Sequence, residues 1–378
     1  MFLIRKNHPI LKFARSSLVD LPTPANLSLN WNYGSLLGIT LGLQIITGII
    51  LATRYSADGD IAFNSIIFLV DTVNNGWILR LLHSTGASFF FILIYLHIGR
   101  GLYYGSYVYT EVWNLGVVLL FILVITAFLG YVLPWGQMSY WGATVITNFL
   151  TAIPYAGKAI TEAVWGGYTV GNPTLTRFFV LHYIFPFVML FVVILHLFYL
   201  HVSGSSNPVG VSSQTYKVTF HNYYVVKDLI GLIVFMFLFG IGTFNNGYDF
   251  IDAENFIPAN SIVTPLHIQP EWYFLFTYAI LRSIPNKLGG VLGIGIAFLV
   301  LFLFRLGTKF NVFRGFNYSP ISRLAFWTLV GTFVTLTWLG RCPAQEPYVE
   351  VSLYITILYH IIFSFILFIS FNNYWFLN

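Results

Sequence analysis

The sequence predicts an all-α polytopic membrane protein with eight transmembrane helices, and three observations support this. The chain is 57% hydrophobic and only 8% charged, whereas about a quarter of the residues of a soluble domain are charged. Apolar runs long enough to cross about 30 Å of hydrocarbon at about 1.5 Å per residue recur along the chain. Two of these runs carry histidine pairs with equal spacing. A soluble globular fold is therefore excluded.

Eight apolar runs define the predicted spans. They cover residues 33–53, 77–102, 113–133, 178–200, 229–244, 288–306, 324–339 and 349–371. We predict two regions, an N-terminal four-helix bundle over 1–207 and a C-terminal membrane region over 208–378, with long connections at 134–177 and 245–287. No signal-peptide pattern precedes the first run, and residues 5–15 read as a basic interfacial segment.

The charges are distributed unequally between the two sides of the membrane. Eight crossings place both termini on one side, which collects eleven basic and three acidic residues, while the other side holds seven basic and ten acidic residues. Lys and Arg concentrate in loops on the side of synthesis. The basic side, with both termini, is therefore predicted to face that compartment, and the net charge of +5 does not indicate nucleic-acid binding.

Cysteine usage restricts the possible cofactors. Cys342 is the single cysteine, so the chain has no internal disulfide, no thiolate-ligated iron–sulfur cluster and no covalent haem attachment through CxxCH. Any haem must be held by coordination alone.

Four histidines lie inside the second and fourth predicted spans. His83 and His97 are 14 residues apart, and so are His182 and His196. This spacing places each pair on one helix face, about 21 Å apart along the axis. The two spans run in the same direction, so each depth offers two imidazoles that suit the axial positions of one haem iron. A lone membrane histidine is more often a proton-relay residue, and zinc is disfavoured because no carboxylate or thiolate accompanies either pair.

Glycines in the first and third spans repeat the same spacing. Gly34 and Gly48 are 14 residues apart, as are Gly116 and Gly130, and the helix directions place one glycine of each pair at each histidine depth. A flat macrocycle between helices needs backbone without side chains, although small residues also serve ordinary helix packing in membranes. Arg80 and Arg100 lie three residues outside His83 and His97 and would either pair with haem propionates or snorkel to lipid phosphates.

Longer motifs resemble a known family. The chain contains Pro270-Glu271-Trp272-Tyr273, a run from Tyr278 to Gly290 and a run from Gly130 to Ala143. With the four histidines, these resemble the cytochrome b family of ubiquinol:cytochrome c oxidoreductases (respiratory complex III) over essentially the full length. The plastid relatives split the chain after the fourth helix and space the second histidine pair by 15, so the mitochondrial form is favoured. Arg341-Cys342 departs from the usually uncharged family pattern.

The resemblance implies an enzyme subunit with two non-covalent haem b groups in the first four helices. Quinol would be oxidised on the acidic side, with one electron passing to an iron–sulfur subunit. The other electron would pass through the low- and then the high-potential haem to quinone on the basic side, coupled to proton translocation. Glu271 would accept a quinol proton, assisted by Tyr273, although from sequence alone it reads as a solvated loop carboxylate. The family match lines this site with Phe128, Tyr131, Gly142, Pro270, Phe274 and Tyr278.

The basic side would hold the quinone-reduction site. By family match, His201 and Asp228 would bind the quinone in a site lined by Asn32, Ser35, Ser205 and Phe220. Without the family match, His201 and Asp228 would be interpreted as ordinary interfacial residues. The resemblance further implies a Rieske-type iron–sulfur subunit and a cytochrome c1-type subunit as partners, a homodimeric complex, and the mitochondrial inner membrane with both termini on the matrix side.

Two other classes of protein share some of these features. A transporter or channel can have eight spans and buried histidines, but it would not need glycines at the haem depths and would lack a Soret band. A two-haem ferric or ascorbate-dependent reductase would share the histidine pairs, but it would have no use for the motif around Glu271 and would ignore quinone-site inhibitors.

Overall fold

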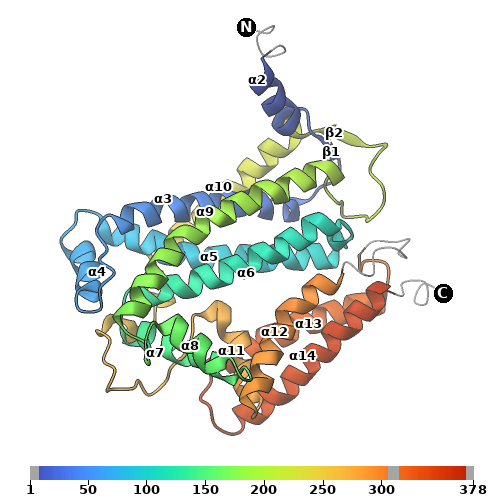
Figure 1. The fold of residues 1–378 in the computed structure, drawn as a ribbon. Coiled ribbons are helices and arrows are strands. Elements are labelled where there is room, and N and C mark those ends of the chain that lie inside the picture. The colour runs from blue at the N-terminus through green and yellow to red at the C-terminus, as the bar shows by residue number, and fades with distance from the viewer. Residues whose placement is uncertain (1–7, 305–314, 372–378) are drawn as a thin grey trace.

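A computed structural model describes residues 8–304 and 315–371 and shows long helices in two groups (Figure 1). Residues 5–7 of the predicted interfacial segment, and 305–306 at the end of the sixth predicted span, lie outside the described residues. Each predicted span coincides with a helix: α3 (Tyr33–Ala52), α5 (Gly76–Tyr103), α6 (Thr110–Val132), α9 (Asn172–Ser203), α10 (Val226–Phe244), α12 (Lys287–Leu303), α13 (Pro320–Arg341) and α14 (Tyr348–Phe371).

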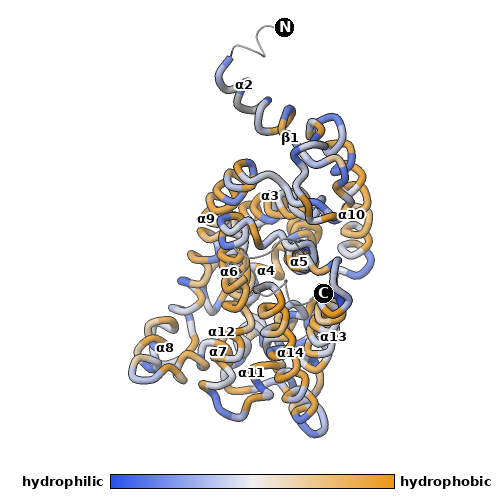
Figure 2. Tube along the Cα trace, turned by 90° about the vertical axis from the view of Figure 1, so that its right-hand side faces the viewer, coloured by the Kyte–Doolittle hydropathy of each residue, from blue (hydrophilic) through white to orange (hydrophobic). Residues whose placement is uncertain are grey.

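Six helices of the described part are long and apolar enough to cross a membrane. The two that fall outside this set are α12, with 17 described residues, and α13, which carries Arg323 and Arg341 near its ends. Figure 2 shows the apolar residues along the helices and most polar residues near their ends and in the connections. This pattern is expected when the helix surfaces face lipid and the connections face water.

The first group of helices encloses the histidines. Helix α3 packs against α5, α6 packs against α9, and α10 covers α3 and α5. Pro186 lies inside α9, where its ring nitrogen cannot donate to the carbonyl four residues earlier, that of His182. Helix α9 is followed by Gly204, whose φ of +76° suits a residue without Cβ.

The second group contains the C-terminal helices. Helices α12, α13 and α14 pack around the short helix α11 (Leu275–Ser283). Local capping starts two of them: the Asn286 side chain accepts from the Gly289 amide at 2.9 Å before α12, and the Ser319 hydroxyl accepts from the Ser322 amide at 3.3 Å before α13. Between the groups, the Trp113 indole donates to the Leu301 carbonyl at 2.7 Å.

Shorter elements occupy the connections. Helices α4 (Ala62–Asp71), α7 (Gln137–Asn148) and α8 (Gly157–Trp165) lie at one end of the first group, and α2 (Pro9–Ala14) projects from the other end. There, β1 (Pro22–Pro24) pairs antiparallel with β2 (Lys217–Thr219). The Tyr224 hydroxyl donates to the Pro24 carbonyl, and Lys227 donates to the Leu27 carbonyl at 2.5 Å. These contacts tie the segment before α3 to the start of α10.

Candidate haem and quinone sites

The two histidine pairs face each other at two levels of the first helix group. The ring centres of His83 and His182 are 6.2 Å apart, and those of His97 and His196 are 6.5 Å apart. Two metal–nitrogen bonds of about 2 Å, with roughly 1.2 Å from each nitrogen to its ring centre, give about 6.4 Å. Both separations therefore fit one iron bound between two axial imidazoles.

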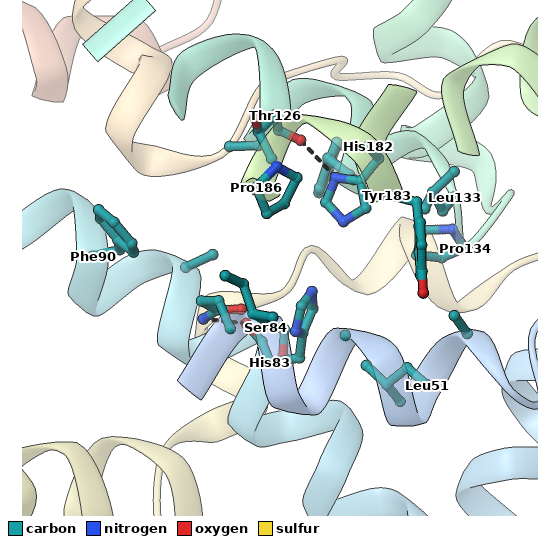
Figure 3. Close-up of a pocket in the computed structure, with 18 of the residues that line it drawn as sticks. Leu51, His83, Ser84, Phe90, Thr126, Leu133, Pro134, His182, Tyr183 and Pro186 are labelled. Carbon is teal, nitrogen blue, oxygen red and sulfur yellow. Dashed lines mark hydrogen bonds between the residues drawn. The ribbon is translucent and has the colours of Figure 1, made fainter. Parts of the chain in front are cut away.

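In the level nearer the acidic side, each histidine Nδ1 atom makes a hydrogen bond to a threonine and not to the facing histidine. Nδ1 of His182 lies 2.8 Å from the Thr126 carbonyl, and Nδ1 of His83 lies 2.9 Å from the Thr47 hydroxyl. Figure 3 shows the two rings on either side of the cavity, with the bond between His182 and Thr126 drawn. Because a carbonyl only accepts, His182 carries its proton on Nδ1, and its Nε2 keeps the lone pair that a metal requires.

The four predicted glycines lie against the four histidines. A Cβ added to Gly48 would lie 3.1 Å from Cε1 of His83, one on Gly116 would lie 3.3 Å from Cε1 of His196, and one on Gly34 would lie 3.7 Å from Cε1 of His97. A Cβ on Gly130 would overlap the His182 ring. From the sequence we expected these glycines to make room for the macrocycle, and in the structure they also make room for the imidazole rings.

The predicted arginines offer unpaired donors next to the histidines. Nη1 of Arg80 and Nε of Arg100 are buried and lack a hydrogen-bond partner among the described residues. A buried guanidinium nitrogen without a hydrogen-bond partner is costly unless an anion pairs with it. Arg80 also lines the same cavity as His83 and His182, which has a volume of about 240 Å³. These orphan donors suit propionate groups.

A second cavity of about 290 Å³ brings together the residues assigned to quinol oxidation. Apolar and aromatic side chains from α6, α7 and α11 form most of its wall. Seven of the predicted residues line it: Phe128, Tyr131, Gly142, Pro270, Glu271, Phe274 and Tyr278. An apolar cavity with a few convergent polar groups is typical of a site for a small apolar ligand.

Glu271 and Tyr273 lie differently around this cavity. Glu271 lines both cavities, and burial raises the pKa of its carboxyl group to about 8, with Arg80 acting in the opposite direction. Tyr273 lines only the cavity of His83, and its ring stacks on Phe91 with centres 4.0 Å apart. Tyr273 therefore lies outside the second cavity, although Glu271 and Tyr131 share the first cavity with it.

The residues assigned to quinone reduction cluster only partly. The Asp228 carboxylate lies beside the Ser35 hydroxyl, and the Asn32 amide donates to the Lys227 carbonyl at 2.8 Å. His201 is exposed in the last turn of α9, and within the described residues no hydrogen bond or ion pair joins it to Asp228. Two further residues of this set are half-buried, Ser205 and Phe220.

Sequence reasoning missed Thr47 and Thr126, which bind the Nδ1 atoms. The available signal was their position on the helices: Thr47 directly precedes Gly48, and Thr126 lies one turn before Gly130. Zinc remains a poor occupant, because the described part of the chain holds no group of three or more His, Cys, Asp and Glu residues that could bind a metal, and structural zinc uses four protein ligands.

The fold and the facing histidines define a helical membrane protein in which two histidine pairs meet at separations that fit a haem iron. Models of two protein families match the chain, one described as cytochrome b/b6/petB over residues 18–204 and one as cytochrome b (C-terminal)/b6/petD over residues 258–360. A curated protein named cytochrome b from Brachionus plicatilis is 66% identical over 355 residues, covering 94% of each chain. The chain belongs to the cytochrome b family.

A solved structure supports the same fold. A chain of a structure titled "Hyperthermophilic respiratory Complex III" has a TM-score of 0.90 and 32% identity, over 98% of this chain and 99% of that chain. The family resemblance and the predicted all-α membrane bundle are thus confirmed.

Proposed function

We propose that this chain is the di-haem subunit of a ubiquinol:cytochrome c oxidoreductase that oxidises quinol on one face of the membrane and reduces quinone on the other. The observation that carries the proposal is the pair of facing histidine layers, His83 with His182 and His97 with His196, at separations that fit axial ligation. Two haem b groups held in these layers would supply one-electron carriers at two depths.

The residues around the layers hold such groups by distinct means. The four histidines would bind the irons through ring nitrogens, and Arg80 and Arg100 would provide cationic donors for propionates. Gly34, Gly48, Gly116 and Gly130 keep the space beside the rings free of side chains. This division of roles explains why the two levels carry the same residue types.

The second cavity is the proposed quinol-oxidation site. Its wall accepts an apolar ring and tail, and the Glu271 carboxylate takes a proton from the quinol hydroxyl. Because Glu271 also lines the first cavity, a proton accepted at one cavity can leave towards the other. The pKa of about 8 makes the carboxyl group a base of useful strength near neutral pH. Tyr273 supports this loop through its stacking on Phe91.

The opposite face carries the proposed quinone-reduction site. Asp228 lies in the first turn of α10 and His201 in the last turn of α9, both at the end that holds His97 and His196. A carboxyl group and an imidazole bind the two quinone oxygens and deliver protons. The lining is proposed to come from Asn32, Ser35, Ser205 and Phe220.

The proposal includes location and partners. We place the chain in the mitochondrial inner membrane with both termini on the matrix side, since the basic connections share that end. A Rieske-type iron–sulfur subunit, a cytochrome c1-type subunit and a second copy of the complex are the proposed partners. The regions 1–207 and 208–378 correspond to the proposed haem bundle and the remainder.

The test is a haem assay with reduced-minus-oxidised spectra of the purified complex. The wild-type complex is expected to contain two b-type haems per chain. The His83→Leu variant should lose chiefly the acidic-side haem, and the His97→Leu variant should lose chiefly the basic-side haem. His360→Gln is the matched control, because His360 is an intramembrane histidine whose hydrogen bonds within the described residues go to the Thr356 and Gly293 carbonyls. Two unchanged haems in either leucine variant would refute the layers, and absence of a Soret band in wild type would refute the function.

A further inference from the structure

We infer that Thr47 is a positioning residue whose hydroxyl fixes the tautomer and orientation of His83 and thereby lowers the midpoint potential of the acidic-side haem. The inference rests on the proposed function and adds a residue that family motifs and histidine spacing did not identify. It begins from the 2.9 Å contact between the Thr47 hydroxyl and Nδ1 of His83.

The proton of the Thr47 hydroxyl is already used within its own helix. Thr47 is 3% exposed, and its Oγ1 lies 2.7 Å from the Leu43 carbonyl and 3.3 Å from the Gln44 carbonyl. A hydroxyl has one proton to donate, and a carbonyl can only accept. A lone pair of Oγ1 therefore faces His83, so His83 carries its proton on Nδ1 and leaves Nε2 free for iron.

The same helix also fixes the orientation of the ring. Gly48 follows Thr47, and a Cβ there would lie 3.1 Å from Cε1 and 3.8 Å from Nδ1 of His83. Gln44, one turn earlier, donates from Nε2 to the His83 carbonyl at 3.0 Å. Ring and backbone of His83 are thus both held by α3, through a hydroxyl, an open glycine and an amide.

This hydrogen bond has an electronic consequence. Donation from Nδ1–H to an acceptor raises the basicity of a ligating imidazole, which favours the more positively charged, oxidised iron. In the other layer, a guanidinium nitrogen of Arg100, which is a donor group, lies 3.3 Å from Nδ1 of His97. The hydrogen bond between Thr47 and His83 therefore lowers the midpoint potential of the acidic-side haem relative to that of the basic-side haem.

The experiment is a potentiometric titration of both haems in the assembled complex, followed by optical and electron paramagnetic resonance spectra. In Thr47→Val, the oxidised-to-reduced ratio of the acidic-side haem at a given potential is expected to fall about tenfold, an upward shift of about 59 mV. The electron paramagnetic resonance spectrum of the oxidised acidic-side haem should also change, because the His83 ring is less constrained. The basic-side haem should keep its wild-type midpoint potential. Thr47→Ser restores the hydroxyl and is expected to behave as wild type.

The matched control is Thr40→Val. Thr40 lies two turns earlier on α3, is fully buried, and bonds the Leu36 carbonyl at 2.8 Å in the same way, but it makes no hydrogen bond to a histidine among the described residues. If Thr47→Val does not assemble, Thr47→Cys replaces it, since a thiol is a weak acceptor and should give a smaller shift of the same sign relative to Thr47→Ser.

An unchanged acidic-side potential in Thr47→Val, or in Thr47→Cys relative to Thr47→Ser, would overturn the inference. An equal shift in Thr40→Val would do the same, because it would show a general effect of losing a helix hydroxyl. These failures are separate from failure of the proposed function, which would appear as a wild-type complex without two haems.

Discussion

At the scale of single residues, Glu271 is the group whose environment differs most from that of an ordinary loop carboxylate. It lines two cavities, and burial raises its pKa to about 8. The carboxylate is the basic form, so the ionised fraction, and with it quinol oxidation, is expected to rise with pH through about 8. Glu271→Gln should keep both haems, slow quinol oxidation by about 10²–10⁴-fold and remove this pH dependence.

The measurement is steady-state quinol oxidation from pH 6 to pH 9 in the isolated complex, with haem content determined in parallel. Glu350→Gln serves as control, because Glu350 is an exposed carboxylate on the same predicted side and contacts Tyr354 rather than either cavity. Wild-type turnover of Glu271→Gln at every pH would show that Glu271 is not the proton acceptor.

Asp228 carries a second prediction at this scale. Asp228→Asn removes a proton donor next to Ser35 while leaving the four histidines in place, so the haems should assemble and their reoxidation by quinone should slow. With an acidic-side inhibitor present, quinol can enter only through the basic face. Rapid-mixing absorbance should then show much slower haem reduction than in wild type. Glu111→Gln, a carboxylate in the first turn of α6, is the control, and equal rates in all three proteins would make Asp228 merely an interfacial charge.

Some site residues could be predicted from the sequence and others could not, for physical reasons. His83 and His97 share a helix, so their spacing alone fixes their relative position. The raised pKa of Glu271 depends on burial between segments distant in sequence, which no local pattern reports. Tyr273 is adjacent to Trp272 in the motif, yet its ring turns to Phe91 in another helix. Thr47 was missed because hydroxyl residues are common in membrane helices.

At the scale of secondary-structure elements, α3 and α6 act as surfaces against which the histidines of α5 and α9 lie. The positions of these helices could be predicted from the sequence, because a long apolar run that crosses a membrane has few alternatives to a helix. The short helices α7, α8 and α11 were not predicted individually, since their sequences mix polar and aromatic residues and their ends depend on tertiary contacts.

A glycine substitution tests this surface directly. Gly130→Ala introduces a Cβ that overlaps the His182 ring, so we expect loss of the acidic-side haem and retention of the other. Gly42→Ala on α3 is the control, because its Cβ would meet nothing within 4 Å and helix propensity should favour alanine by up to about 1 kcal/mol. The measurement is the ratio of haem to protein. Two haems per chain in Gly130→Ala would show that the ring can shift without losing its iron.

At the scale of the whole molecule, the charge asymmetry predicts the orientation, and the single cysteine can report it. Cys342 lies between α13 and α14, is half-buried and is predicted to face the acidic side. A membrane-impermeant thiol reagent should therefore label Cys342 from the outside of mitochondria whose outer membrane has been removed. The double variant Cys342→Ser/Ser212→Cys places an exposed thiol in the connection before β2 and should be labelled only from the matrix side. Labelling of both proteins from the same side would contradict the topology.

The packing of the two helix groups against each other could not be predicted from the sequence. Contacts such as that of Trp113 with Leu301, or of β1 with β2, join residues nearly two hundred positions apart. Apolar periodicity carries no information about which membrane helices are neighbours, because every lipid-facing surface is similarly apolar. The histidine pairs are the exception, since coordination of one metal requires two helices to meet at a defined depth.

The spacing of the histidines also sets an electrical quantity. Fourteen residues of helix separate the two levels by about 21 Å, roughly 70% of a hydrocarbon layer of about 30 Å. A full crossing against an opposing voltage costs about 2.3 kcal/mol per 100 mV, so a charge moved between these levels works against about 1.6 kcal/mol per 100 mV. Under the proposed function, the distance between His83 and His97 along α5 sets how strongly a membrane voltage opposes turnover, and turnover is expected to speed up when the voltage is collapsed.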